Sequence, residues 1–341
     1  MVPRVVLKAR DPTSPSPIDE IALWIEANLG GTRITNVRNG GGGSGWASTH
    51  VLDLSDGRKL FAKIARGRGA SMFRGELEGL NAMRATETIG VPRALHADDL
   101  YGEARGGSWI LMEHVEFARG RGGGGEDMAA LGRQLALMHA ADVPPRPRQA
   151  DADGNDDGNA DANNADASKP FGFHVDNTIG ATPQQNGWMS DWVSFFRERR
   201  LWRQLEMAND TNLLRMGERA LDRMDSFFPD AVARPAPSVL HGDLWSGNHA
   251  WGTIGGRDGT GGPVLFDPAT YYGHSEAEFG MSWCASFDDY FWGAYHEIMP
   301  KEAESYAERR QLYMLYHYLN HLNLFGGGYY YQCEGILKRL G

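Results

Sequence analysis

The segment HGDLWSGN, which begins at His241, carries a carboxylate at Asp243 and an amide at Asn248 within a stretch interrupted by glycines. The short apolar run SVL precedes this segment, and a second apolar run, PVLF, ends just before Asp267. Two short strands of this kind would deliver His241, Asp243 and Asp267 at their ends, so that these side chains converge with Asn248. Phosphoryl transfer from MgATP uses such a set, because one carboxylate orients the attacking hydroxyl while an amide and a second carboxylate hold the metal.

The segments upstream could position a nucleotide beside these residues. Residues 34–65 read as three strands around a glycine run, and the third strand contains Lys63. A helix at 71–85 follows, in which Glu76 shares one face with apolar side chains. A carboxylate on an apolar face needs a cationic partner, and Lys63 on the preceding strand is the natural candidate. The alternative is that both residues are ordinary solvated charges.

These features occur in the order of the protein-kinase-like fold, whose catalytic loop has the spacing H-x-D-x-x-x-x-N. We therefore expect an α+β protein of two lobes: a small β-rich lobe with one main helix at 18–116, and a larger, mostly helical lobe at 117–341. The polar, low-complexity composition at about 149–169 predicts a disordered insertion, and residues 1–17 form an N-terminal extension. Helices of the second lobe are expected at 127–140, 188–208 and 308–325.

Two other interpretations of the central residues are open. In the first, Asp243 caps a turn, Asn248 adopts a left-handed conformation and Asp267 caps a helix. In the second, His241, Asp243 and His249 bind a metal ion in a hydrolytic site. The second interpretation leaves Lys63, Glu76 and the glycine run unexplained.

The composition argues against several classes of function. The chain of 341 residues has a formal net charge of -10, which opposes binding to nucleic acid. Its two cysteines, Cys284 and Cys333, form neither a metal-spaced nor a disulfide pattern. No apolar run of about 18 residues is present, and the first residues lack the apolar core of a secretory signal, so no membrane partner is expected. We expect a cytoplasmic protein, or a plastid protein if a transit peptide has been removed.

Several stretches make the sequence resemble the fructosamine and ketosamine 3-kinases, which are related to aminoglycoside phosphotransferases and choline kinases. These stretches are HGDLWSGN, DPATYYGHSEAEFGM, FGFHVDNTIGATPQQNGW, DWVSFFRERRL and YLNHLNLFG. The resemblance implies phosphorylation, dependent on ATP and Mg²⁺, of the 3-hydroxyl of ribulosamine or fructosamine adducts on amines or protein lysines, which promotes deglycation. The partners would be glycated small molecules or glycated proteins, and the protein a monomer or weak dimer. A kinase of choline or an aminoglycoside, and a non-catalytic nucleotide-binding protein, are the alternatives.

The resemblance also implies roles for individual side chains. Asp243 would act as the catalytic base, and His241 would orient the catalytic loop. Asn248 and Asp267 would bind magnesium. Trp245 would face the sugar, with simple packing as the alternative. The nucleotide would lie among a glycine loop, an ion pair and a hinge, formed by Gly41, Gly42, Gly43, Ser44, Lys63, Glu76, Met112, Glu113 and His114.

Overall fold

The computed structural model describes residues 16–41, 47–67, 71–101, 106–118, 120, 123–144, 170–229, 235–255 and 261–341. The insertion expected at about 149–169 lies outside the described residues, as do residues 1–15 of the expected N-terminal extension. The last two residues of that extension, Ser16 and Pro17, begin helix α1 (Pro17–Asn28). Within the described ranges, no helix combines the length and the apolarity needed to cross a membrane.

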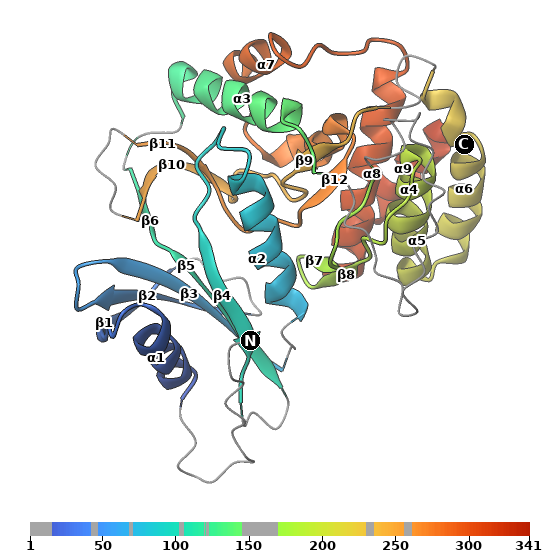
Figure 1. The fold of residues 1–341 in the computed structure, drawn as a ribbon. Helices are drawn as coiled ribbons and strands as arrows, with labels where there is room; N and C mark the ends of the chain where they lie inside the picture. The colour runs from blue at the N-terminus through green and yellow to red at the C-terminus, as the bar shows by residue number, and fades with distance from the viewer. Residues whose placement is uncertain are drawn as a thin grey trace, which may run out of the picture.

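An antiparallel sheet of five strands, in the order β1-β2-β3-β5-β4, forms the N-terminal lobe (Figure 1). In the centre of this sheet, Lys63 pairs with Thr49 on one side and with Ile110 on the other, so its backbone is held by two neighbouring strands. The three strands expected between residues 34 and 65 are confirmed. The strands of the sheet are β1 (Ile34–Asn39), β2 (Ser48–Leu54), β3 (Lys59–Arg66), β4 (Ala94–Asp99) and β5 (Gly107–Glu113).

Helix α1 covers one face of this sheet. Its Ile21 and Ile25 are fully buried in a cluster that includes Ala62 of β3. A capping box fixes its first turn, because the Ser16 hydroxyl accepts from the Asp19 N–H and the Asp19 carboxylate accepts from the Ser16 N–H. In the described part of this lobe, α1 thus accompanies the main helix expected at 71–85.

Helix α2 (Ser71–Arg84) covers the opposite face of the sheet and carries Glu76. Phe73, Leu80 and Met83 are buried in the core beneath it, as their helical spacing predicts. The alternation of side chains along β3 turns Lys63 toward this helix, since the neighbouring Ala62 belongs to the cluster under α1. Strand and helix thus present their two charged groups to one another.

Helix α2 also docks on the C-terminal lobe, through two glycines one turn apart. A Cβ atom added to Gly75 would lie 2.8 Å from the Cα atom of Asn177, the first residue of β7 (Asn177–Ile179). A Cβ atom added to Gly79 would lie 2.8 Å from Oγ1 of Thr270. Both distances are shorter than van der Waals contact, so only glycine allows this approach. The helix of the N-terminal lobe is thereby attached to the C-terminal lobe.

A second, three-stranded sheet in the order β11-β10-β6 links the two lobes. Strand β6 follows β5 almost directly and pairs antiparallel with β10, so the chain enters the C-terminal lobe as part of that lobe's own sheet. The boundary expected near residue 116 falls inside β6, and it stays a prediction. The strands of this sheet are β6 (Val115–Phe117), β10 (His249–Ile254) and β11 (Gly262–Leu265).

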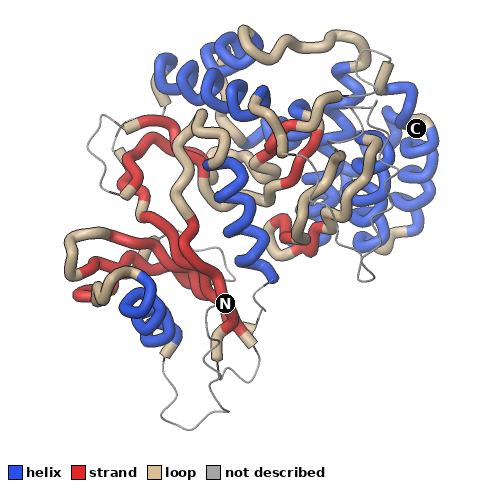
Figure 2. The backbone as a smooth tube through the Cα atoms, in the orientation of Figure 1, coloured by secondary structure: helices blue, strands red, loops and turns tan. Residues whose placement is uncertain are grey.

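The C-terminal lobe is mostly helical, as Figure 2 shows. The helices expected at 127–140 and 308–325 are confirmed as α3 and α8, whereas the helix expected at 188–208 begins only at Trp192, where Asp191 caps it. The helical segments of this lobe are α3 (Gly125–Ala140), α4 (Trp192–Phe195), the π-helix η1 (Phe196–Trp202), α5 (Arg203–Ala208), α6 (Thr211–Asp222), η2 (Met224–Phe227), η3 (Ser275–Cys284), α7 (Asp289–His296), α8 (Tyr306–Phe325), η4 (Gly327–Tyr329) and α9 (Tyr330–Leu340).

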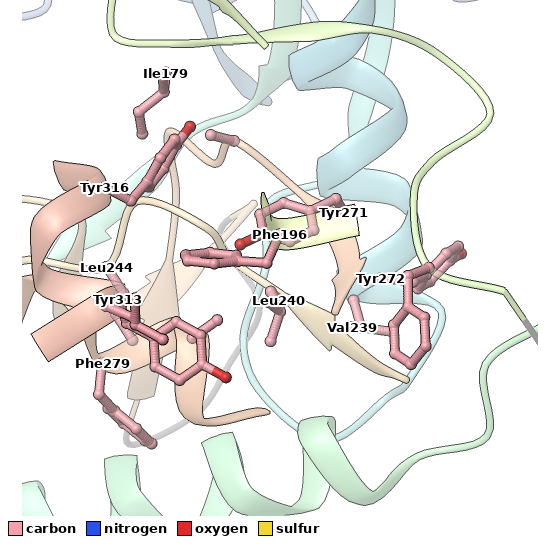
Figure 3. Close-up of a cluster of buried hydrophobic side chains, with 14 of the residues drawn as sticks. Ile179, Phe196, Val239, Leu240, Leu244, Tyr271, Tyr272, Phe279, Tyr313 and Tyr316 are labelled. Atoms are coloured by element: carbon pink, nitrogen blue, oxygen red, sulfur yellow. The ribbon is translucent and has the colours of Figure 1, made fainter. Parts of the chain in front are cut away.

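A buried apolar core supports the polar loops of this lobe. Strand β9 (Ser238–Leu240) pairs antiparallel with β12 (Tyr271–Gly273), and side chains from η1 and α8 pack around this ribbon (Figure 3). Phe196 and Tyr313 meet there edge to face, with ring centroids 5.0 Å apart. The chain leaves this core after β9 and continues at once into the polar segment HGDLWSGN, so rigid packing anchors one end of the loop.

We expect Gly75→Ala to destabilise the protein by about 1–3 kcal/mol, because the new methyl group overlaps the backbone of Asn177 and forces the helix to shift. Gly293→Ala is the matched control. Gly293 also lies within a helix, but a Cβ atom there would meet nothing within 4 Å, so alanine should stabilise the protein by about 0.5–1 kcal/mol. Denaturant unfolding measures both effects, and a Gly75→Ala protein as stable as the parent would contradict the docking.

Candidate active site

The loop between β9 and β10 brings Asp243 and Asn248 beside Asp267. It returns to the sheet at His249, which pairs with Leu265 of β11 just before Asp267. The Asn248 amide nitrogen donates to the Asp243 carbonyl at 2.8 Å, and it lies 3.4 Å from both the Asp243 carboxylate and the Asp267 carbonyl. The three residues expected to converge are in direct contact.

The ammonium of Lys63 connects the nucleotide side of the predicted site to Asp267. Its Nζ lies 2.7 Å from Oε1 of Glu76 and 2.5 Å from Oδ1 of Asp267, although Lys63 and Asp267 are 204 residues apart in the sequence. Burial lowers the pKa of Lys63, but the carboxylates of Asp267 and Glu76 outweigh burial and raise it above its ordinary value. The interpretation of Lys63 and Glu76 as solvated charges is therefore wrong, since they form a buried pair.

Asp267 adopts a strained backbone conformation. Its φ is 58°, in the left-handed region that residues other than glycine rarely occupy. Residues 268–270 after it form no helix, so Asp267 is not a helix cap. Its side chain is 45% exposed, in contrast to the buried side chain of Lys63 that it contacts. Such strain is typical of functional sites, where the surrounding structure holds a residue in an unfavourable geometry.

Asp243 is half-buried in the loop. Burial, followed by the negative charge of Asp267, raises the pKa of Asp243 to about 7, against the opposing effect of the Asn248 amide. A carboxylate whose pKa lies near neutral pH is suited to accept a proton from a hydroxyl group. This is the chemistry that the sequence predicts for Asp243.

His241 fixes the shape of the loop. Its Nδ1 accepts from the N–H of Asp243 at 3.2 Å, so Nε2 carries the proton and donates to the carbonyl of Phe266 at 2.8 Å. Burial lowers the pKa of His241, which favours the neutral ring required for these two bonds. The ring thus ties the residue before Asp267 to the loop that carries Asp243, and His241 acts on the site through these backbone groups.

A buried carboxylate that the sequence interpretation missed, Glu278 of η3, holds the start of the loop. It accepts from the backbone N–H groups of His241 at 2.6 Å and of Gly242 at 2.9 Å, and it contacts Nε2 of His139 at 3.2 Å. Burial alone would raise the pKa of Glu278, but His139 and His241 with the backbone N–H groups lower it below its ordinary value. Its position in the stretch HSEAEFG offered no spacing signal, because its partners are distant in the sequence.

The predicted hinge lies between the two sheets. Met112 pairs with Phe61 of β3 near the end of β5, and it is buried. The N–H of Glu113 donates to the carbonyl of Arg93 at 3.0 Å, and the carbonyl of His114 accepts from an N–H of the segment after β10 at 2.9 Å. The hinge is therefore held from both lobes. Its contact with adenine stays a prediction.

The predicted glycine loop is described only at its first residue. Gly41 has a φ of 69°, and its carbonyl accepts from the Thr49 hydroxyl at 3.1 Å. The other predicted loop residues, Gly42, Gly43 and Ser44, lie outside the described residues. A cavity of about 450 Å³ opens beside the base of the loop, lined by Val37, Arg38, Asn39, Gly41, Ser48, Thr49 and His50.

Trp245 stands at the outer side of the catalytic loop and is 39% exposed. Its ring lies directly against Gly247, where an added Cβ atom would force the ring to shift. The next residue, Ser246, donates its N–H to the carbonyl of Cys284 at 3.1 Å, which ties the loop to the end of η3. An exposed ring beside Asp243 can contact a bound molecule, so the prediction that Trp245 faces the sugar stays in place beside the packing interpretation.

The donor atoms present suit a magnesium ion bound together with a nucleotide. Asp267 offers a half-exposed carboxylate and Asn248 an amide oxygen, whereas Mg²⁺ in nucleotide sites takes one or two such ligands along with phosphates and water. In the described ranges, no group of three or more His, Cys, Asp and Glu side chains could hold a metal ion. His249 is engaged instead with the carbonyl of Ala285 at 3.0 Å, which argues against the hydrolytic interpretation.

Comparison with known proteins gives concordant matches over nearly the whole chain. The model of the fructosamine kinase family matches residues 17–340. The chloroplastic protein-ribulosamine 3-kinase of Arabidopsis thaliana is 43% identical over 323 residues, which are 94% of this chain and 86% of that protein. A solved structure from Thermobifida fusca, provisionally named fructosamine-3-kinase, has a TM-score of 0.72 at 26% identity and covers 94% of this chain and 98% of its own.

A more distant match extends the same fold to a ligand complex. A thermostable mutant of the aminoglycoside phosphotransferase APH(4)-Ia, solved in a ternary complex with ADP and hygromycin B, has a TM-score of 0.56 at 14% identity. The match covers 94% of this chain and 99% of that one. At this identity the comparison shows the fold alone, and it confirms the expected bilobal α+β architecture.

We expect Asp243→Asn to raise the melting temperature of the nucleotide-free protein at pH 8 by several degrees. The folded pKa of about 7 lies above the ordinary value of about 3.9, so folding favours the protonated form and the ionised carboxylate destabilises the protein as pH rises toward 7. The gain should be largest at pH 8 and should shrink steadily toward pH 5. Asp222→Asn, at an exposed position of α6, controls for the loss of one negative charge. A gain independent of pH would contradict the assignment.

We expect Glu278→Gln to lower kcat by about 10- to 100-fold. The glutamine side chain has one acceptor oxygen in place of two, so one of the two backbone N–H groups loses its partner and the loop shifts. The KM for ATP should change little. Glu276→Gln is the matched control in the same helical turn, since Glu276 binds Arg309 at 2.7 Å and should affect stability but not kcat. Steady-state kinetics and thermal unfolding of both variants separate these outcomes, and equal losses of kcat would contradict the role of Glu278.

Proposed function

The chain belongs to the fructosamine kinase family, and we propose that it is an ATP-dependent ketosamine 3-kinase. It transfers the γ-phosphate of ATP to the 3-hydroxyl of ribulosamine or fructosamine adducts on small amines or protein lysines. The observation that carries this proposal is the contact of Lys63 with both Glu76 and Asp267, in reach of the Asp243 and Asn248 pair. A family member with these groups intact has the machinery for transfer, which argues against a non-catalytic role.

The nucleotide is held mainly by Lys63 and by the metal-binding side chains. An ammonium has three donors, so Lys63 can keep Glu76 and Asp267 as partners and offer its third N–H to a phosphate oxygen. Asn248 and Asp267 would hold magnesium, which neutralises charge on the phosphates when it is bound. Binding of the phosphates therefore requires no new partner for Glu76, because the pair with Lys63 is already formed.

The acceptor hydroxyl is activated by Asp243. As the 3-oxygen of the sugar forms its bond to the γ-phosphorus, the bond from that phosphorus to the bridging oxygen of ADP breaks, and the hydroxyl proton passes to the Asp243 carboxylate. His241 and Glu278 hold the loop so that this carboxylate keeps its place during transfer. The product carries phosphate at C3, a better leaving group than hydroxide, which promotes loss of the sugar from the amine.

Two finer points of the proposal concern the preferred sugar and the compartment. We propose that ribulosamines are used better than fructosamines, because a Trp245 ring that faces the sugar would exclude an extra hydroxymethyl group. Discrimination of this kind is worth about 1–3 kcal/mol. The name of the Arabidopsis relative places that protein in the chloroplast. For this chain, the cytoplasm or the plastid stays a prediction.

The proposed function is tested by incubating the protein with MgATP and a ribulosylated peptide, followed by mass spectrometry. We expect one phosphate on each ribulosamine site and subsequent loss of the sugar. Asp243→Asn should retain ATP binding while turnover falls by about 100-fold or more. Phosphorylation of choline or of an aminoglycoside, with none on any ketosamine, would overturn the substrate assignment and leave the kinase fold in place.

A further inference from the structure

A connected group of aromatic side chains, here called the aromatic wall, lies at the end of η3 and along the second half of α8. Trp283 stacks on Tyr318 with ring centroids 4.2 Å apart and planes at 16°. His321 stacks on Phe325 and on Tyr329, with ring centroids 5.6 Å and 5.0 Å apart, and Phe325 and Tyr329 also contact one another at 6.4 Å. The two stacks join, because Trp283 meets His321 edge to face at 6.2 Å. These five rings therefore form one continuous surface.

The aromatic wall remains accessible in the folded chain. Trp283 is 36% exposed and Phe325 is 59% exposed, whereas Tyr313 and Tyr316 on the same helix are buried. The other three rings, Tyr318, His321 and Tyr329, are partly exposed. Single exposed aromatic residues are common, but a connected and accessible set is characteristic of a surface that contacts another molecule. The five rings come from η3, α8 and η4, and each contacts at least one other ring of the set. They therefore form a preorganised surface.

The aromatic wall begins at the catalytic loop. The carbonyl of Cys284, the residue after Trp283, accepts from the N–H of Ser246, the residue after Trp245. Burial raises the pKa of the Cys284 thiol, and the negative charge of Asp243 adds to this effect, which places the thiol within electrostatic reach of the catalytic carboxylate. The hydrogen bond thus joins the chain next to Trp283 to the chain next to Trp245, so a substrate whose sugar lies at Asp243 can extend its remaining part toward the aromatic wall.

The chemistry of a ketosamine suits this surface. If the proposed function holds, the sugar lies at Asp243 and the amine carries an alkyl chain away from it. In a glycated lysine this chain is four methylene groups long, and it joins the cationic nitrogen next to the sugar to the peptide backbone. Such methylene chains pack well on apolar and aromatic surfaces. Burial lowers the pKa of His321, so the ring is neutral at physiological pH and does not repel the substrate ammonium. The overall charge of -10 also favours a cationic substrate.

We propose that the aromatic wall binds the methylene chain of a glycated lysine and the peptide that follows it, and so determines which amine the enzyme accepts. This inference rests on the proposed function and extends it from the sugar to the amine. Trp283 and Tyr318 contact the part of the chain next to the sugar, and Phe325 contacts the part farther out. Small amine adducts reach only the catalytic loop and gain nothing from the wall.

The test compares three ribulosamines that differ only in the amine: the adducts of methylamine, of Nα-acetyl-lysine amide, and of a lysine within a short peptide. For Trp283→Ala we expect kcat/KM to fall by about tenfold for the lysine and peptide adducts, and by less than about twofold for the methylamine adduct. Trp283→Phe, which keeps an aromatic face, should recover most of the loss. Phe325→Ala should affect the peptide adduct more than the lysine adduct.

Tyr331→Ala is the matched control, because Tyr331 is 77% exposed but lies outside the aromatic wall, and it should leave all three rates unchanged. A loss of equal size for all three adducts in Trp283→Ala would show that the wall only supports the fold, and unchanged rates would show that it contacts no substrate. Either result overturns the inference. Phosphorylation of the methylamine adduct by the parent protein tests the proposed function separately, and if no ribulosamine is phosphorylated, both proposals fall.

Discussion

The ammonium group of Lys63 forms ion pairs with two carboxylates that come from different lobes. Glu76 is too deeply buried to carry a charge without a cationic partner, and Lys63 is too deeply buried to stay charged without carboxylates. Asp267 adds a second carboxylate partner for Lys63 from the C-terminal lobe. The central position of β3 in its sheet and the left-handed conformation of Asp267 each serve to bring one of these groups to the same point.

The catalytic loop is held by a second arrangement of the same kind, built from backbone N–H groups instead of an ammonium. Glu278 accepts from two consecutive N–H groups at the start of the loop, and His241 bridges the loop to the residue before Asp267. Both are buried, so the loop is held by interactions that water does not weaken. The carboxylate of Asp243 is thus held in place by a rigid loop. Its pKa is raised because this position is partly buried and lies near the negative charge of Asp267.

The sequence allowed prediction of those parts of the site that depend on short spacing. The interval from His241 to Asn248, the alternation that turns Lys63 to one face and the helical position of Glu76 are all local patterns, and the structure places them as expected. Glu278 could not be found in this way, because its partners lie 36 and more residues away and a carboxylate in a short helical turn has no characteristic period. The same applies to Trp283, whose neighbours come from α8.

The docking of α2 by two glycines has a consequence for regulation. In kinases whose equivalent helix can swing outward, the ion pair forms only in a fraction of the molecules, and nucleotide affinity is reduced by that fraction. Here Gly75 and Gly79 bring the helix into direct contact with the C-terminal lobe, which opposes an outward swing of α2 that would separate Glu76 from Lys63. For a helix fixed at two points we expect little control of activity by helix movement, so the rate should follow the supply of substrate.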